Sequence, residues 1–276
     1  MVSKLNYTKT LRDLGIAYLG SYSQSMKMRK SYENGTVTYC VYLAPWNMSG
    51  HNVCPGGLHC HKFCLNGSGQ NKLQIFSKGF EQSPINKARI KRTKLFYDNN
   101  ELFMRLMIHE IRKTQKYAEK HNMGFSVRIN ATSDISPEKF IDPDTGLNLL
   151  QLFPNVQFYD YTKVITRLNL LEKYPNYYLV FSYDGHNIEK CKYALEHGVN
   201  VAVVFSNQQM LPMKFMGYNV VDGNQYDMRY LDEPNSIVGL HYHTTAANYD
   251  KNGKYIEPDE DFVIRDDNEM IEWYAD

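Results

Sequence analysis

The sequence has almost no net charge and no long apolar run. Lysine and arginine together number 31 and aspartate and glutamate 30, which gives a formal charge of +1. This balance offers no electrostatic reason to expect DNA or an anionic membrane surface as the main partner. No apolar run approaches the length of a membrane span, and residues 1–20 have no apolar signal region. We therefore expect a cytoplasmic protein without a membrane partner.

Cysteine is scarce and unevenly placed. The chain has five cysteines, an odd number that is not typical of a secreted disulfide framework. Cys54, Cys60 and Cys64 fall within eleven residues, in a stretch that also contains Gly56 and Gly57. Clustered thiols in a reducing compartment favour metal binding. The roles of the other two, Cys40 and Cys191, are left open, although a buried strand position is expected for the first.

Short apolar strands alternate with helical segments over most of the chain. This alternation predicts parallel βαβ units, and the near-continuous apolar runs indicate strands that are buried on both faces. The expected fold is α/β, a partial (β/α) barrel of about six or seven mostly parallel strands. The predicted strands are 36–43, 125–130, 156–159, 177–182, 199–206, 218–221 and 237–241, and the predicted helices include 101–117, 163–173 and 188–197.

Three segments are expected along the chain. Residues 1–35 are polar and tyrosine-rich, and they read as an N-terminal extension. Residues 36–249 form the barrel-like domain, whose loop at 45–70 contains the three clustered cysteines. Loops of this length without regular structure are usually functional. Residues 250–276 are acidic and read as a C-terminal extension.

Polar side chains follow the carboxyl end of each predicted strand. In α/β folds these ends share one rim, which would also include the cysteine loop. Ser and Asp at such junctions are also common helix N-caps. Arg128 lies inside a strand and has to be paired if it is buried, with Asp134 or Asp160 as the expected partner. The candidate catalytic residues are Arg128, Asp134, Asp160 and Lys163, and the candidate cofactor-binding residues are Asn130, Ser133, Tyr159, Tyr161, Ser182, Tyr183, Ser206, Asp222 and His241.

The cysteine spacing suggests an iron–sulfur cluster. Cys54, Cys60 and Cys64 have the pattern C-x5-C-x3-C with no fourth cysteine nearby. Three thiolates suit a [4Fe-4S] cluster that keeps one iron open to a small molecule. A Cys3His zinc site is the main alternative, because His51, His59 and His61 lie among the cysteines. Three unliganded thiols are the remaining alternative.

The order of elements resembles that of radical S-adenosylmethionine (SAM) enzymes. A strand is followed by the three-cysteine loop, a helix and then repeated βα units. The resemblance implies that SAM binds the open iron and that an electron-donor protein supplies one electron to cleave it. The spacing departs from the usual C-x3-C-x2-C of that superfamily. The Gly-Gly-Glu segment that holds the methionyl amine also has no clear counterpart, and Asp134 or Asp160 would take its role.

A second resemblance covers about residues 45–247. The motifs are similar to those of tailed-phage proteins that carry a "gene product 88"-like domain. This resemblance implies a bacteriophage or prophage origin, a place in the host cytoplasm and a shared cysteine loop, but it supplies no reaction. The motifs are CPGGLHCHKFCLNGSG, VRINATSDIS, FPNVQFYDYTKV, NYYLVFSYDG, VNVAVVF, VVDGNQYDMRYLD and IVGLHYHTTA.

Three functions are therefore expected, in order of preference. The first is a [4Fe-4S] protein with an open iron, acting as a radical-SAM-like enzyme. The second is a non-SAM iron–sulfur protein that serves electron transfer, sensing or Lewis-acid chemistry. The third is a zinc-stabilised module that binds nucleic acid through the basic run 87–94, although a solvated helix face is the preferred interpretation of that run because the chain as a whole is neutral.

Overall fold

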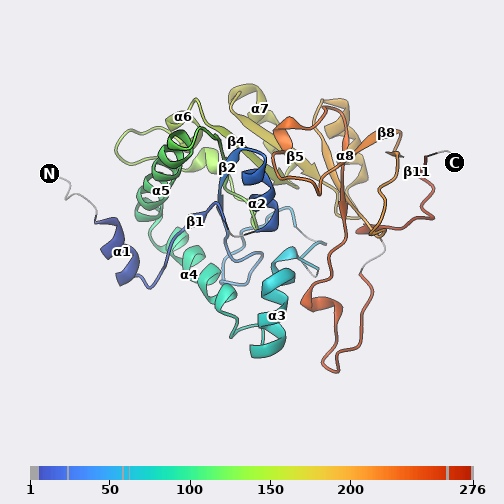
Figure 1. Ribbon diagram of the computed structural model, residues 1–276, viewed down its shortest axis with the longest axis horizontal. Coiled ribbons are helices and arrows are strands. Elements are labelled where there is room, and N and C mark those ends of the chain that lie inside the picture. Colours follow the sequence, from blue (N-terminus) through green and yellow to red (C-terminus); the bar gives the residue numbers. More distant parts are fainter. Residues whose placement is uncertain (1–5, 24, 58, 62, 259–260, 275–276) are drawn as a thin grey trace.

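A mixed sheet with helices on both faces forms the centre of the protein (Figure 1). The computed structural model describes residues 6–23, 25–57, 59–61, 63–258 and 261–274. Within these residues eleven strands form one sheet in the order β1-β2-β3-β4-β5-β6-β9-β8-β7-β11, with β10 also beside β6. The strands are β1 Gly20–Ser21, β2 Thr36–Val41, β3 Gly124–Arg128, β4 Gln157–Thr162, β5 Tyr177–Ser182, β6 Val201–Phe205, β7 Lys214–Phe215, β8 Tyr218–Asp222, β9 Ile237–His241, β10 Val263–Ile264 and β11 Ile271–Glu272.

The neighbouring strands β2, β3, β4, β5, β6, β9 and β8 pair in parallel, as the alternating pattern predicted. All the predicted strands are present with slightly different ends, and the antiparallel edge strands β1, β7 and β11 were not predicted. The α/β class is thus as expected. The helices are α1 Tyr7–Asp13, α2 Met26–Glu33, α3 Gly69–Lys78, α4 Pro84–Asp98, α5 Asn100–Lys120, α6 Leu149–Leu152, α7 Leu170–Lys173 and α8 Ile188–Glu196, with 3-10 turns η1 Leu65–Gly67, η2 Pro137–Lys139, η3 Ile165–Asn169, η4 Arg229–Leu231 and η5 Ala246–Asn248.

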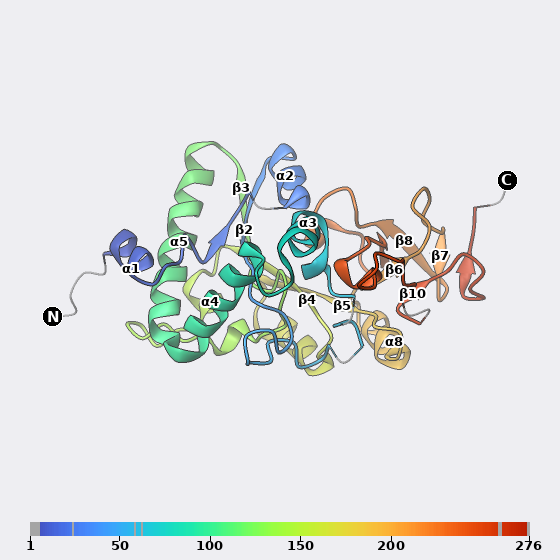
Figure 2. The same ribbon diagram turned by 90° about the horizontal axis from the view of Figure 1, so that it is seen from below.

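The expected barrel is not confirmed, because the sheet stays open within the described part of the chain. The N-terminal strand β1 pairs antiparallel with the outer edge of β2, where a barrel would need its closing strand. Gly20 makes this pairing close: a Cβ atom at Gly20 would lie 2.4 Å from the ring of Tyr39. The predicted N-terminal extension therefore contributes β1 to the edge of the sheet. Figure 2 shows α1 and β7 at opposite ends of the molecule.

Neighbouring residues of β2 show what covers each face of the sheet. The hydroxyl of Tyr39 contacts Glu110 on α5, whereas the thiol of Cys40 lies 3.3 Å from the sulfur of Met28 on α2. Because adjacent strand residues point to opposite faces, α5 and α2 cover different faces. Figure 2 shows these two helices on opposite sides of β2 and β3. Cys40 is fully buried in the strand, as expected.

The larger apolar core lies on the α5 face. Phe103, Leu106 and Met107 of α5 are fully buried there and pack with the strand residues Val127 and Phe158. A small separate cluster of Val180, Ala202 and Val238 occupies the other face. No helix among the described residues is both long and apolar enough to cross a membrane.

Glu110 is a buried carboxylate within the α5 core face. It accepts hydrogen bonds from the backbone N–H groups of Leu19 at 3.0 Å and Gly20 at 2.8 Å, and from the hydroxyls of Tyr7 and Tyr39. These four donors come from α1, from the segment that enters β1, and from β2. One side chain thus joins the N-terminal segment to the sheet. Burial and the Glu110 carboxylate both raise the pKa of Tyr39 well above its usual value.

Replacing Glu110 with alanine should lower the free energy of unfolding by about 3 kcal/mol, because it leaves buried N–H and O–H donors without an acceptor. Glu119→Ala is the matched control, since Glu119 is exposed on the same helix, and it should change stability by less than about 0.5 kcal/mol. Urea denaturation of the two variants measures the difference. Equal effects at the two positions would show that the Glu110 contacts do not stabilise the fold.

Candidate functional site

The cysteine loop lies across the carboxyl ends of β3, β4 and β5. It is joined to the segment after β3 by a hydrogen bond from the backbone N–H of Asp134 to the carbonyl of Val53, at 2.8 Å. The thiol of Cys54 lies 3.9 Å from the carbonyl of Thr132. The ring of His59 lies 4.0 Å from the ring of His186, which follows β5. Segments that are far apart in the sequence therefore meet at one edge of the sheet.

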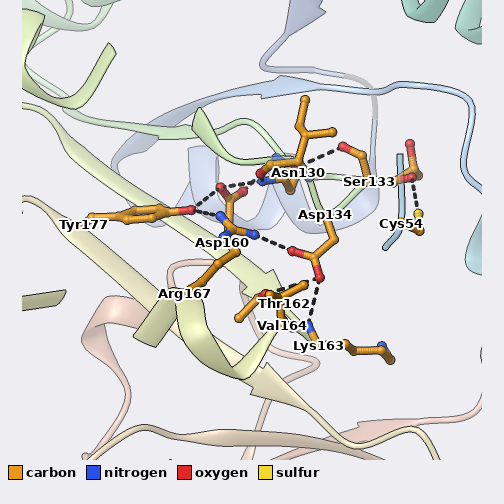
Figure 3. A network of polar contacts seen from close by, with 12 residues as sticks. Cys54, Asn130, Ser133, Asp134, Asp160, Thr162, Lys163, Val164, Arg167 and Tyr177 are labelled. Atoms are coloured by element: carbon orange, nitrogen blue, oxygen red, sulfur yellow. Dashed lines mark hydrogen bonds and ion pairs between the residues drawn. The ribbon is translucent and has the colours of Figure 1, made fainter. Parts of the chain in front are cut away.

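Asp134 fixes the geometry of this edge through its carboxylate (Figure 3). It accepts hydrogen bonds from the backbone N–H of Lys163 at 2.8 Å and from the hydroxyl of Thr162 at 3.2 Å. It also forms a buried ion pair with Arg167 on η3. A buried carboxylate with this many donors is well compensated. Asp134 therefore binds the cysteine loop through its backbone and the end of β4 through its side chain.

Arg167 continues the network to Asp160. Its guanidinium donates to the hydroxyl of Tyr177, which donates to the Asp160 carboxylate at 2.9 Å. Asp160 also accepts from the backbone N–H of Asn130 at 2.7 Å and from the Asn130 side chain at 2.9 Å. Both predicted aspartates are thus occupied by bonds within the protein (Figure 3).

Asn130 and Ser133 shape the turn that leads to Asp134. The side-chain oxygen of Asn130 accepts from the Ser133 hydroxyl at 2.9 Å and from the N–H of Ile135 at 2.8 Å. Its amide group donates to the carbonyl of Ile135 at 2.9 Å. Such side-chain bonds replace regular backbone pairing in a turn. These two candidate residues lie at the predicted edge, where they hold the loop in position.

Cys54 and Cys60 approach each other across Gly57. A Cβ atom at Gly57 would lie 3.3 Å from Cys54 Cβ and 3.4 Å from Cys60 Sγ. The pKa of Cys54 is raised to about 12, mainly by burial; the backbone N–H of Trp46 acts in the opposite direction, and the charges of Cys64 and Cys60 add to the rise. Burial is also the main cause of a raised pKa at Cys64, where Cys60 adds to the effect. Burial is thus the main influence on the pKa of both thiols.

Backbone N–H groups point at two of these sulfurs. The N–H of Trp46 lies 3.4 Å from Cys54 Sγ, and the N–H of Asn66 lies 3.5 Å from Cys64 Sγ. Hydrogen bonds to sulfur stabilise thiolate ligands and tune clusters. Cys64 opens η1, and the next turns are held by buried amides: the Asn66 and Asn71 side chains both donate to the Asn86 side chain on α4, at 3.1 and 2.8 Å.

The basic run on α4 supports this loop. Arg89 donates to the side chain of Asn66 and stacks on Tyr42 with 5.1 Å between guanidinium and ring. Arg92 is buried and donates to the carbonyls of Tyr18 and Tyr42 at 2.9 and 3.2 Å. The expectation of a purely solvated face is therefore wrong for these two arginines, because their side chains point inward and hydrogen-bond other parts of the protein. Lys87, Lys91 and Lys94 of the same run are exposed.

The type of metal that the cysteine loop could bind depends on its donor atoms and on their separation. Among the described residues, no group of three or more His, Cys, Asp or Glu side chains is arranged to hold a metal ion. A zinc ion needs its sulfur ligands within about 4 Å of one another, because Zn–S bonds are about 2.3 Å long. A four-iron cluster binds each thiolate through a different iron and so accepts a wider separation. The N–H groups that face Cys54 and Cys64 are donors of the kind that thiolate ligands accept.

The histidines of the loop have aromatic neighbours. His61 stacks on Trp46 with ring centres 4.7 Å apart, and His51 stacks on Tyr97 at 4.1 Å. Lys62 and Leu58 of the loop lie outside the described residues.

Lys163 lies between the cysteine loop and a cavity. A Cβ atom at Gly56 would lie 2.8 Å from Lys163 Cβ, so only glycine allows the loop to approach this closely. Burial would lower the pKa of Lys163, but the charges of Cys60, Asp134, Asp184 and Cys54 together raise it. Figure 3 shows its side chain extending away from the Asp134 carboxylate that its backbone binds.

The cavity next to Lys163 has a volume of about 600 Å³. It lies between the cysteine loop, η2, η3 and α8. Its lining is both apolar and charged, which is common in small-molecule sites. The lining residues are Pro55, Gly56, Asp134, Ser136, Glu138, Lys139, Lys163, Val164, Ile165, Thr166, Arg167, Leu170 and Lys190.

Arg128 lies elsewhere and has another partner than expected. It is paired with Asp227, at 2.7 Å, rather than with Asp134 or Asp160. The hydroxyl of Tyr159 donates to the same Asp227 oxygen at 2.9 Å. The guanidinium carbon of Arg128 lies over the ring of Tyr161, 4.6 Å from the ring centre. The physical reason is the strand period: Arg128, Tyr159 and Tyr161 point to the α2 face, whereas Asp160 points to the α5 face.

The remaining candidates contact other parts of the sheet. Ser182 is buried, and the ring of Tyr183 packs against Phe215 at 6.4 Å. Ser206 and Asn207 contact Asp266 in the C-terminal segment.

Asp222 and His241 lie on the strands beyond β6. Asp222 accepts from the N–H and the side chain of Asn224 at 2.8 and 2.7 Å, and His241 is 2.7 Å from the carbonyl of Asn207. Of the predicted residues, the structure thus brings Asn130, Ser133, Asp134, Asp160 and Lys163 together beside the cysteine loop.

Comparison with known proteins identifies the family. A family model described as Gene product 88 matches residues 9–257. The chain belongs to the Gene product 88 family. This confirms the resemblance based on the longer motifs, but it does not support the resemblance to radical SAM enzymes. No curated protein and no solved structure matches the chain. The Gene product 88 match includes the cysteine loop and the cavity lining, and it ends before β10 and β11.

Several residues of this site were not singled out in the sequence. Arg167 lies in a stretch that reads as an ordinary helix, and its role appears only when η3 brings it to Asp134. Lys139 and Lys190 lie in short polar stretches on η2 and α8, and no local signal distinguishes them from other surface lysines.

Asp160 should make stability depend on pH. Burial raises its pKa from 3.8 to about 6, although Arg167 and its hydrogen-bond donors act in the opposite direction. The folded state therefore holds the proton more tightly than the unfolded state. The protonated Asp160 therefore adds to the free energy of unfolding. This addition is complete below about pH 4 and is lost as the pH rises through about 6, and it amounts to about 3 kcal/mol.

The comparison of wild type with Asp160→Asn isolates this effect. The stability of the wild type relative to the variant should fall between pH 4 and pH 7, as measured by urea denaturation at several pH values. A constant difference over this range would show that Asp160 titrates normally.

Proposed function

We propose that the protein binds a [4Fe-4S] cluster through Cys54, Cys60 and Cys64 and leaves one iron open to a small molecule. The observations that support the proposal are the close approach of Cys54 and Cys60 across Gly57 and the place of the cysteine loop at the carboxyl edge of a parallel sheet. In α/β proteins this edge is the usual place for ligands. Gly57 lets Cys54 and Cys60 approach each other, and backbone N–H groups face two of the sulfurs.

The surroundings of the loop support a redox centre. When bound, such a cluster supplies a Lewis-acidic and one-electron centre. Lys163 contributes positive charge beside Cys60 and Cys54, which offsets the negative charge of thiolate ligands. Asp134 and Arg167 hold the end of β4 against the loop, so the thiols keep a fixed distance from the strands. These residues orient the site.

The finer proposal is that the open iron takes SAM, as in radical SAM enzymes. Its support is the order of strand, cysteine loop and βα units. Asp134 and Asp160, which were expected to hold the methionyl amine, are already engaged by Arg167, Asn130 and Tyr177. Glu138 fits that role better, because it lines the adjoining cavity and its Oε2 atom is buried without a hydrogen-bond partner. A non-SAM iron–sulfur protein is the alternative function.

Protein purified without oxygen should be brown and contain about four iron and four sulfide ions per chain. Cys54→Ser, Cys60→Ser and Cys64→Ser should each lose most of this iron, because three thiolates are the minimum set. Cys191→Ala is the control, since its thiol lies in α8 outside the loop, and it should retain iron. A colourless wild type with one zinc per chain would contradict the cluster.

SAM should change the electron paramagnetic resonance spectrum of the reduced protein, and 5′-deoxyadenosine should form. Glu138→Gln should weaken this response at a given SAM concentration, because it removes the carboxylate charge and keeps the size. The matched control is Glu172→Gln, an exposed acid on α7. A protein that has the cluster signal but does not respond to SAM would belong to the non-SAM alternative.

A further inference from the structure

The 600 Å³ cavity beside the cysteine loop has features of a binding site in its own right. Sites for small organic ligands typically measure about 300–1,000 Å³ and combine apolar walls with a few polar groups. Here Pro55, Val164, Ile165 and Leu170 provide apolar surface. A bare inorganic ion would leave this surface against water, so the size and the walls favour an organic molecule.

The lining of the cavity carries more positive than negative charge. Four cationic and two acidic side chains line the cavity, which leaves a net charge of +2. One cation and one acid, Arg167 and Asp134, neutralise each other in their buried ion pair. Lys139, Lys163 and Lys190 remain, with only Glu138 to oppose them.

The three lysines are available to a ligand. Within the described part of the chain, none of them takes part in a salt bridge. Lys139 on η2 and Lys190 on α8 are exposed, and Lys163 is half-buried at the wall next to the loop. They come from three different elements and line one cavity. Lysine is a common point charge for phosphate and carboxylate groups.

We propose that this cavity binds a small organic anion, in which an apolar or aromatic body lies against Val164, Ile165 and Leu170 and a phosphate or carboxylate group faces Lys139, Lys163 and Lys190. The site is formed by side chains alone and needs no cluster. It therefore goes beyond the function proposed above. A ligand in this cavity would lie next to Lys163, which also carries its charge close to Cys60 and Cys54.

Three probes with the same naphthalene ring test the two parts of the proposal: 2-naphthyl phosphate, 2-naphthoate and neutral 2-naphthol. Isothermal titration calorimetry should detect binding of at least one of the two anions and much weaker binding of the neutral probe. Binding of the phosphate alone, or of the carboxylate alone, identifies which group the lysines select. Equal binding of 2-naphthol, or no binding of any probe, would overturn the proposal.

Charge reversal locates the site. The double variant Lys139→Glu/Lys190→Glu should weaken binding of the preferred anion about tenfold, because two attractive charges become repulsive. The matched control is Lys173→Glu/Lys192→Glu, which changes the net charge equally at exposed lysines of α7 and α8 that do not line the cavity. The control should bind as tightly as wild type. An equal loss in both double variants would overturn the assignment, because it would reflect the overall charge of the protein.

Binding of the anionic probe should not depend on the presence of iron. Titrations are run on protein purified with and without oxygen, and both preparations should bind the anion. Binding that requires the anaerobic preparation would contradict a site made by side chains alone. A failure to find iron and sulfide leaves the anion site intact, and a failure of all three probes leaves the cluster proposal intact.

Discussion

The carboxylate of Asp134 is the contact on which the arrangement of the site depends. Its side chain binds the end of β4 and Arg167, while its backbone N–H donates to the carbonyl of Val53, the residue before Cys54. Without this carboxylate the end of β4 would lose an acceptor and Arg167 would be left as a buried charge. The buried ion pair therefore holds η3 and the end of β4 beside the segment that contacts the cysteine loop.

The sheet divides its buried charges between its two faces. The α5 face has the network of Asp160, Tyr177 and Arg167, which leads to the cysteine loop. The α2 face has Arg128 and Asp227, which lie under η4. The strand period of two residues separates these groups although Tyr159 and Asp160 are neighbours in the sequence. A sequence cluster of polar residues at a strand end can thus serve two unrelated networks.

The strands and the place of the cysteine loop could be predicted, and the pairing of strands and charges could not. Apolar runs such as 177–182 identify buried parallel strands wherever they stand in the sheet. Whether the sheet closes depends on its edges, and here Gly20 places β1 on the edge that a barrel would use. The partners of Arg128 and Asp134 lie 99 and 33 residues away along the chain. Local sequence patterns carry no information on such contacts.

The short strand β10 has a consequence for the order in which the protein can fold. β5 pairs with β6 through Val201 and Ala202, and β10 pairs with the remaining half through Val204 and Phe205. Residues 263–264 therefore complete the neighbours of a central strand that is made some sixty residues earlier. During synthesis on the ribosome, β6 has open backbone groups until this segment emerges. Non-local parallel pairing of this kind is slow, and a nascent chain at this stage is exposed to aggregation and to chaperones.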